Sequence, residues 1–203
     1  PVNVTPTPPD AQALNCKPMF NKATLQTAKV DTSNKFVTLT VKGFGDIKVQ
    51  LYEKDAPKAV ENFLRLTNAG FFDCLTFHRI SKGFVVQGGD PLGNGTGGES
   101  AFGAEFADEL NADTPSYKAG YVKGVLAMAN HGPNTNSSQF FIMLGDVPIP
   151  HLYTIFGKVV AGQDIVDKIG QAEIIPNLQM NPAGTDGTPK EAVVIEKAVI
   201  TSK

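Results

Sequence analysis

The chain has 203 residues, of which 41% are hydrophobic and 19% charged, a composition typical of a globular protein. Its net charge of −2 offers no basic surplus to neutralise phosphates, which argues against a nucleic acid as the main partner. The longest unbroken apolar runs, Val125–Ala129 and Phe140–Leu144, are far shorter than the roughly 20 residues of a membrane-spanning helix. The sequence therefore argues against both of these classes and predicts a folded core.

The first 33 residues differ from the rest of the chain. Residues 1–10 contain four prolines and no aromatic residue, which indicates an extended arm, and residues 11–33 show little periodicity. We therefore divide the chain into a proline-rich extension or tether over residues 1–33 and a folded domain over residues 34–203. Because the chain begins at Pro1 without a methionine, we expect a trimmed N-terminus. A removed signal or lipid anchor and an ordinary frayed terminus are both compatible with this arm.

The folded domain is predicted to consist of short strands and two helices. Residues 36–41 and 47–51 alternate as strands do, and the glycine-rich segment between them predicts a hairpin. Asp55 and Pro57 mark a helix start, with Asp55 as the cap, and Gly70 ends that helix. A second helix fits residues 163–169, and further strands are predicted around residues 75–80, 84–88, 122–129, 139–144, 153–160 and 192–201. About eight short strands and two α-helices predict a mostly β fold, a closed or nearly closed antiparallel barrel.

The segment FHRISKGFVVQGGD over residues 77–90 combines charged and large apolar residues. Alternation along a strand predicts that Phe77 and Arg79 share one face, while His78 and Ile80 share the other. An arginine among apolar residues is costly unless its donors meet acceptors. From the pattern alone, Arg79 either forms a structural ion pair with an Asp or Glu, or it serves a bound ligand.

Two further segments contain candidate binding residues. Residues 93–98 (GNGTGG) satisfy the dinucleotide pattern G-x-G-x-x-G, but no convincing helix follows them and the chain lacks alternating strands and helices. A loop with several residues at positive φ is the better interpretation. The segment MANHGPNTNSSQFFI over residues 128–142 places Gln139 beside Phe140 and Phe141, which predicts a binding wall. The three histidines are too far apart in sequence for a zinc-ligand pattern, so we expect no metal site.

In this order, the segments resemble the cyclophilin family of peptidyl-prolyl cis-trans isomerases. The resemblance runs from about residue 36 to 200 and includes APKAVENF over residues 56–63 and FGKV over residues 156–159. It implies an eight-stranded barrel with two helices, in agreement with the strand pattern, and an enzyme that needs no cofactor. It also implies a monomer whose partners are proline-containing peptides and unfolded or folding proteins.

Matched position by position, Arg79 resembles the family's catalytic arginine. The other matches are substrate-binding positions in a surface groove: His78, Phe84, Val85, Gln87, Gly95, Ala129, Asn130, His131, Gln139, Phe141, Ile149 and Tyr153. Many members have methionine where this chain has Val85, and residues 149–153 replace a loop that contains tryptophan. Because the chain has no tryptophan, we expect weak cyclosporin binding.

These departures leave an alternative beside the active isomerase, namely a proline-peptide-binding or chaperone module with little turnover. The two cysteines also allow two interpretations: Cys16 and Cys74 form a disulfide that attaches the extension to the barrel, or Cys74 packs as a small apolar residue. A disulfide would indicate an oxidising compartment. Together with the proline-rich extension it favours an exported protein of the periplasm, the cell envelope or another oxidising compartment, with the cytoplasm as the alternative.

Overall fold

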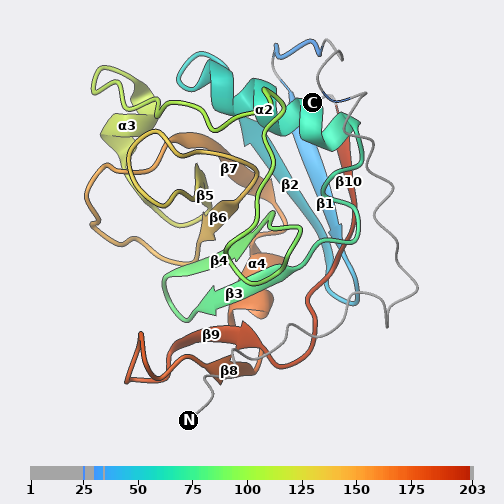
Figure 1. The fold of residues 1–203 in the computed structure, drawn as a ribbon, viewed down its shortest axis with the longest axis vertical. Coiled ribbons are helices and arrows are strands. Elements are labelled where there is room, and N and C mark those ends of the chain that lie inside the picture. The colour runs from blue at the N-terminus through green and yellow to red at the C-terminus, as the bar shows by residue number, and fades with distance from the viewer. Residues whose placement is uncertain (1–24, 26–29, 34, 202–203) are drawn as a thin grey trace.

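The structure of the protein is a computed structural model that describes Leu25, residues 30–33 and residues 35–201. The predictions for the proline-rich start and for Cys16 lie outside these residues. The described strands are β1 (Phe36–Val41), β2 (Gly45–Leu51), β3 (Phe77–Ser81), β4 (Val85–Gly88), β5 (Val125–Met128), β6 (Phe140–Met143), β7 (Ile155–Ala161), β8 (Ile174–Pro176), β9 (Asp186–Pro189) and β10 (Ile195–Thr201). The helices are α2 (Pro57–Asn68), α3 (Pro115–Ala119) and α4 (Gln163–Gly170), as Figure 1 shows. Within the described part of the chain, no helix is long and apolar enough to cross a bilayer.

The ten described strands form one antiparallel sheet in the order β10-β1-β2-β7-β5-β6-β4-β3-β9-β8. Eight of them, β1 to β7 and β10, correspond to the predicted strands, so the mostly β architecture is confirmed. The prediction of a closed eight-stranded barrel is wrong, because the sheet is not closed and two further strands extend it. The segment before β3 meets the segment before β10 through an isolated bridge between Thr76 and Val194, which does not make a continuous ladder.

A hairpin on the outer edge of β3 accounts for the two additional strands. β9 pairs with β3 through Ile80–Gly187 and Ser81–Asp186, and β8 pairs with β9. β9 thereby occupies the hydrogen-bonding edge of β3, so the sheet continues into β8 and β3 does not pair with β10. In Figure 1 this hairpin lies below β3 at the lower edge of the molecule. We call residues 174–189 the edge hairpin.

The main core lies between the sheet and α2. Phe63 of α2 is buried there, and its ring centroid lies 4.8–5.4 Å from those of Phe72, Phe140 and Phe156. Leu25 is buried in the same core, and Nε and Nη2 of Arg65 donate to its carbonyl oxygen at 3.2 and 2.6 Å. At Leu25, the segment that precedes residue 34 therefore contributes to the folded core.

The N-terminus of α2 is capped from a distant part of the chain. The Glu109 carboxylate accepts hydrogen bonds from the backbone N–H groups of Lys58 and Ala59 at 3.0 and 2.9 Å. The predicted cap, Asp55, instead accepts the backbone N–H of Ser116 at the start of α3, at 2.9 Å. The prediction of α2 is confirmed, but Asp55 as its cap is wrong, because tertiary packing brings a different carboxylate to the helix end.

Candidate active site

A β-bulge at His78 determines the direction in which Arg79 points. Phe77 pairs with Gly88 on β4 and Arg79 pairs with Gln87, so β3 takes two steps where β4 takes one. The extra residue reverses the alternation of faces. Phe77 is therefore buried in the main core, whereas the Arg79 side chain lies on the outer face with 40% of its surface exposed. The prediction that Phe77 and Arg79 share a face is wrong for this reason.

On the outer face, four residues form a row across four neighbouring strands. Arg79 of β3 lies opposite Gln87 of β4, Gln87 opposite Phe141 of β6, and Phe141 opposite Ala127 of β5. Directly opposed residues of antiparallel strands share a face, and their side chains are neighbours. The register therefore places a cation, an amide and an aromatic ring side by side.

A chain of side-chain hydrogen bonds connects Arg79 to the loop of residues 90–98. Nη1 of Arg79 donates to Oε1 of Gln87 at 2.9 Å, and Nε2 of Gln87 donates to Oε1 of Gln139 at 2.9 Å. Nε2 of Gln139 donates to the carbonyl oxygens of Gly95 and Gly97 at 3.0 and 2.6 Å. Because each amide is held on both sides, the chain fixes one edge of the Arg79 guanidinium relative to the loop.

Asp186 of the edge hairpin holds the other edge of the guanidinium. Its carboxylate accepts Nε–H of Arg79 at 2.9 Å and Nη2–H at 2.6 Å, so Arg79 forms an ion pair, and this pair leaves its role towards a ligand open. Burial acts to raise the pKa of Asp186, but the hydrogen bonds and charge of Arg79, together with the Ser81 hydroxyl, outweigh it and hold that pKa below its usual range. Sequence reasoning missed Asp186, because the edge hairpin shows no strand-like alternation.

An apolar cluster covers the adjacent part of the outer face and is separate from the main core. Val85 and Phe141 are buried in it, and Phe84, Ile149 and Tyr153 pack against it as partly buried residues. The rings of Phe141 and Tyr153 meet edge to face, with centroids 5.4 Å apart. The structure thus brings together the four residues that the resemblance implies as walls of a pocket for the proline ring, Phe84, Val85, Phe141 and Ile149, and places Tyr153 beside them.

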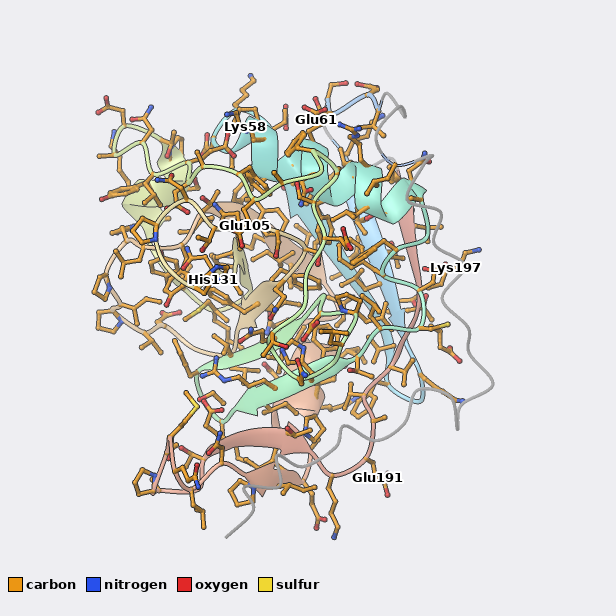
Figure 2. The ribbon with its side chains drawn as sticks, viewed as in Figure 1. Lys58, Glu61, Glu105, His131, Glu191 and Lys197 are labelled. Carbon is orange, nitrogen blue, oxygen red and sulfur yellow. The ribbon has the colours of Figure 1, made fainter. Side chains whose placement is uncertain are left out.

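A cavity of about 510 Å³ adjoins the glutamine chain. Six of the predicted residues line it: Gln87, Gly95, Ala129, Asn130, His131 and Gln139. Glu105 also lines the cavity, and its Oε1 lies 3.2 Å from Nε2 of the exposed His131; Figure 2 labels both side chains. Sequence reasoning missed Glu105, which stands in a loop without a periodic pattern.

Asn130 and Tyr121 hold the loop of residues 149–153 in place. Nδ2 of Asn130 donates to the carbonyl oxygen of Leu152 at 2.9 Å. The Tyr121 hydroxyl donates to the Tyr153 carbonyl at 2.8 Å and accepts the Tyr153 backbone N–H at 3.1 Å. The loop that lacks tryptophan is therefore ordered by two polar side chains from the neighbouring strand region.

Asp90 organises the glycine-rich loop. This carboxylate is 1% exposed and accepts the backbone N–H groups of Leu92, Asn94 and Gly95 at 2.8, 3.0 and 2.6 Å. Gly93 and Gly95 have φ angles of +64° and +89°, so the prediction of a loop with positive-φ glycines is confirmed. Sequence reasoning missed Asp90, although an aspartate that accepts the N–H two residues later is a recognisable turn signal.

His78 lies in the bulge and is not among the residues that line the cavity. Its side chain is buried, and only 5% of the residue is exposed. Burial lowers the pKa of His78, although the charge of Asp90 acts in the opposite direction. The shift favours the neutral imidazole, which is buried at the bulged position of β3.

Two further expectations concern a metal site and the cysteines. Among the described residues, no group of three or more His, Cys, Asp or Glu side chains is arranged to hold a metal ion. Cys74, which precedes β3, is disulfide-bonded. Its predicted partner, Cys16, lies outside the described residues, so that pairing stays a prediction.

Comparison with known proteins connects this geometry to one family. The family model described as cyclophilin type peptidyl-prolyl cis-trans isomerase/CLD matches residues 36–200. Peptidyl-prolyl cis-trans isomerase CYP18-2 of Arabidopsis thaliana is 44% identical over 147 residues, which cover 72% of this chain and 87% of that protein. Peptidyl-prolyl cis-trans isomerase cypE of Dictyostelium discoideum is 48% identical over 126 residues, covering 62% and 78% of the two chains.

Solved structures show the same likeness. A crystal structure of a Cryptosporidium parvum cyclophilin type peptidyl-prolyl cis-trans isomerase matches with a TM-score of 0.72 and 34% identity, covering 84% of this chain and 99% of that one. A second crystal structure of that protein, in the presence of the dipeptide Ala-Pro, matches with a TM-score of 0.71.

Proposed function

The chain belongs to the cyclophilin-type peptidyl-prolyl cis-trans isomerases, and from this membership we propose which of its residues perform the isomerisation. The activity is rotation about Xaa-Pro peptide bonds, and it needs no cofactor. One observation carries the assignment. Arg79 lies in a single row with Gln87, which lines the cavity, and Phe141, which belongs to the apolar cluster.

The reaction requires stabilisation of a twisted amide. The Xaa-Pro bond must pass through a geometry in which C–N resonance is lost, over a barrier of about 18–20 kcal/mol. At that geometry the proline nitrogen becomes pyramidal and gains a lone pair, which the planar ground state lacks. A donor aimed at this nitrogen therefore binds the transition state more tightly than the substrate, and each 1.36 kcal/mol of such preference is about tenfold in rate.

Arg79 has the donors that this role requires. A guanidinium carries five N–H groups and stays charged at any physiological pH. The hydrogen bonds to Asp186 and Gln87 engage three of them, at Nε, Nη2 and Nη1. Two N–H groups, one on each Nη, are left for a substrate at the outer face. We assign Arg79 as the catalytic residue that donates to the proline nitrogen.

The apolar cluster is the proposed binding site of the proline ring. Phe84, Val85, Phe141, Ile149 and Tyr153 offer an apolar surface that holds the ring while the preceding carbonyl turns. The related Cryptosporidium parvum protein was crystallised in the presence of Ala-Pro, which supports proline-containing peptides as ligands here. An apolar surface also excludes water and strengthens the interaction with the Arg79 charge.

The flanking peptide is proposed to lie in the adjoining cavity. Gln139 lines this cavity, and the hydrogen-bonded chain that also holds Arg79 fixes its amide. Asn130, His131 and Gly95 line the same cavity and are proposed contacts for the residues before the proline. Holding the proline ring and the flanking backbone confines the motion to the carbonyl between them and positions the amide beside Arg79.

The test is cis-trans exchange of a short Ala-Xaa-Pro-Phe peptide measured by NMR. Arg79→Ala is expected to lower the exchange rate about 100-fold, comparable to the loss of a preorganised donor in other enzymes. Lys82→Ala removes a cation from the turn that follows β3 and is expected to leave the rate unchanged. Near-normal exchange by a folded Arg79→Ala protein would remove Arg79 from the mechanism.

The cellular location is a separate proposal. Disulfides persist in oxidising compartments, and the disulfide at Cys74 therefore supports an exported protein. Its proposed clients are unfolded or folding chains that expose proline, and its proposed state is a monomer.

A further inference from the structure

The edge hairpin places the Asp186 carboxylate in contact with Arg79. Asp186 is the first residue of β9 and lies opposite Ser81 on β3, one step from the Ile80–Gly187 pair. Arg79 and Ser81 are two residues apart on β3 and share a face, so Asp186, opposite Ser81, lies on that face as the diagonal neighbour of Arg79. A shift by one residue would turn the carboxylate to the other face.

A glycine next to Asp186 allows β8 and β9 to approach each other closely. Gly187 lies opposite Pro176 on β8, and a Cβ atom at position 187 would collide with the carbonyl oxygen of Ile175. A larger residue here would separate β8 from β9 and displace the adjacent Asp186. Glycine at position 187 therefore helps to keep the Asp186 carboxylate within reach of Arg79.

The contact differs from an ordinary surface ion pair. The Asp186 side chain is 15% exposed, and its two oxygens meet two different nitrogens of Arg79. Such a two-point contact fixes the plane of the guanidinium as well as its position. Gln87 fixes the opposite side through Nη1. The Arg79 guanidinium is thus clamped between two strands, and only the end that carries the two remaining N–H groups is directed to a ligand.

We propose that Asp186 is a positioning residue for the isomerisation, which holds the Arg79 guanidinium in the plane where its remaining donors meet the twisted proline amide. The proposal rests on the catalytic role assigned to Arg79. Two effects of the carboxylate oppose each other: it orients the donors, and it offsets part of their positive charge. Orientation prevails, because a displacement of about 1 Å at a reacting group costs on the order of 100-fold in rate.

The two effects predict opposite outcomes for Asp186→Asn. This variant keeps the shape and one acceptor oxygen but loses the charge and the second hydrogen bond. If orientation prevails, kcat for a proline peptide falls about tenfold, while the dissociation constant of the Ala-Pro dipeptide changes less than twofold. In Asp186→Ala, kcat is expected to fall further than in Asp186→Asn. Asp186→Glu is expected to recover part of the rate that Asp186→Ala loses, because it restores two oxygens.

A matched control separates the clamp from the hairpin as a whole. Glu173 and Lys190 form an exposed ion pair at 3.0 Å at the base of the same hairpin. Glu173→Gln removes that pair without touching Arg79 and is expected to leave kcat unchanged. The backbone amide resonances of β3 and β9 report whether each variant keeps the hairpin paired.

The outcomes are decisive in both directions. A selective fall of kcat in Asp186→Asn, with a paired hairpin and an unaffected Glu173→Gln, supports the clamp. An unchanged or increased kcat in Asp186→Asn overturns it, as does an equal loss in Glu173→Gln. Should Asp186→Ala lose its fold, Asp186→Asn and Asp186→Glu still decide the question. A wild type that binds Ala-Pro without exchange, or an active Arg79→Ala, would instead refute the proposed function.

Discussion

Removing the Glu109 carboxylate is expected to destabilise the protein by about 2 kcal/mol. The carboxylate accepts the N–H groups of Lys58 and Ala59, the second and third residues of α2, at 3.0 and 2.9 Å. These are the orphan donors that a capping side chain normally satisfies, and Pro57 at the first position has no N–H to satisfy. Glu109 is thus the cap of a helix that begins 52 residues before it.

The magnitude follows from the two interactions that are lost. A capping side chain contributes about 0.5–2 kcal/mol, and a negative charge at a helix N-terminus adds about 0.3–1 kcal/mol. Glu109 is partly exposed, so solvent screens the charge and the sum stays near the middle of this range. Glu109→Ala should lose about 2 kcal/mol, and Glu109→Gln, which keeps one acceptor oxygen, about half of that.

Urea denaturation followed by circular dichroism measures the difference. In thermal unfolding of a chain of this size, the same 2 kcal/mol corresponds to a fall in melting temperature of about 4–8 °C. Glu191→Gln serves as the control, because Glu191 is exposed and Figure 2 shows it at the opposite end of the molecule from Lys58. If Glu109→Ala unfolds at the same urea concentration as Glu191→Gln, the long-range cap contributes nothing and the reasoning fails.

Two further predictions concern the backbone and the bulge. Gly89→Ala should destabilise by about 3 kcal/mol or more, because φ is +85° and the new Cβ collides with the Ser138 carbonyl; Gly83→Ala, at φ +73° with no atom within 4 Å, should cost about 1–2 kcal/mol. Equal midpoints in denaturation would contradict this. The pKa of His78 is lowered in the folded chain, so below about pH 6.5 the unfolded chain binds a proton that the folded chain does not. The free energy of unfolding should therefore decrease as the pH falls from 7 to 5, by at most about 1.4 kcal/mol per pH unit. His78→Gln should flatten this dependence, and an unchanged slope would contradict the assignment.

Most strands could be predicted because their pattern is local. β1 from Val37 and β2 from Ile47 alternate apolar and polar residues, and both strands were found in sequence and structure at nearly the same bounds. The edge hairpin could not be predicted this way. β9 has the sequence DGTP and is a strand because β3 offers it an unpaired edge, which is a property of the assembled sheet.

The candidate site shows the same division. Phe84, Val85 and Phe141 of the apolar cluster could be identified because they stand in long, specific segments, and the structure brings them together. The face of Arg79 could not be read from alternation, since one bulged residue at His78 reverses it. Asp186 lies 107 residues from Arg79 in the chain, and no local spacing indicates that contact.

The geometry of Arg79 therefore depends on contacts of very different range. Its hydrogen bond to Gln87 spans eight residues and forms with the β3–β4 hairpin, whereas the Gln87–Gln139 bond spans 52 and the Asp186 bond 107. Short-range contacts close at a lower entropic cost than long-range ones, so the β3–β4 hairpin can form while the guanidinium is still unconstrained on one edge. The two N–H groups left for substrate acquire a fixed direction only when β9 has paired with β3. Catalytic competence should accordingly require docking of the edge hairpin, even though the apolar cluster and the glutamine chain lie on other strands.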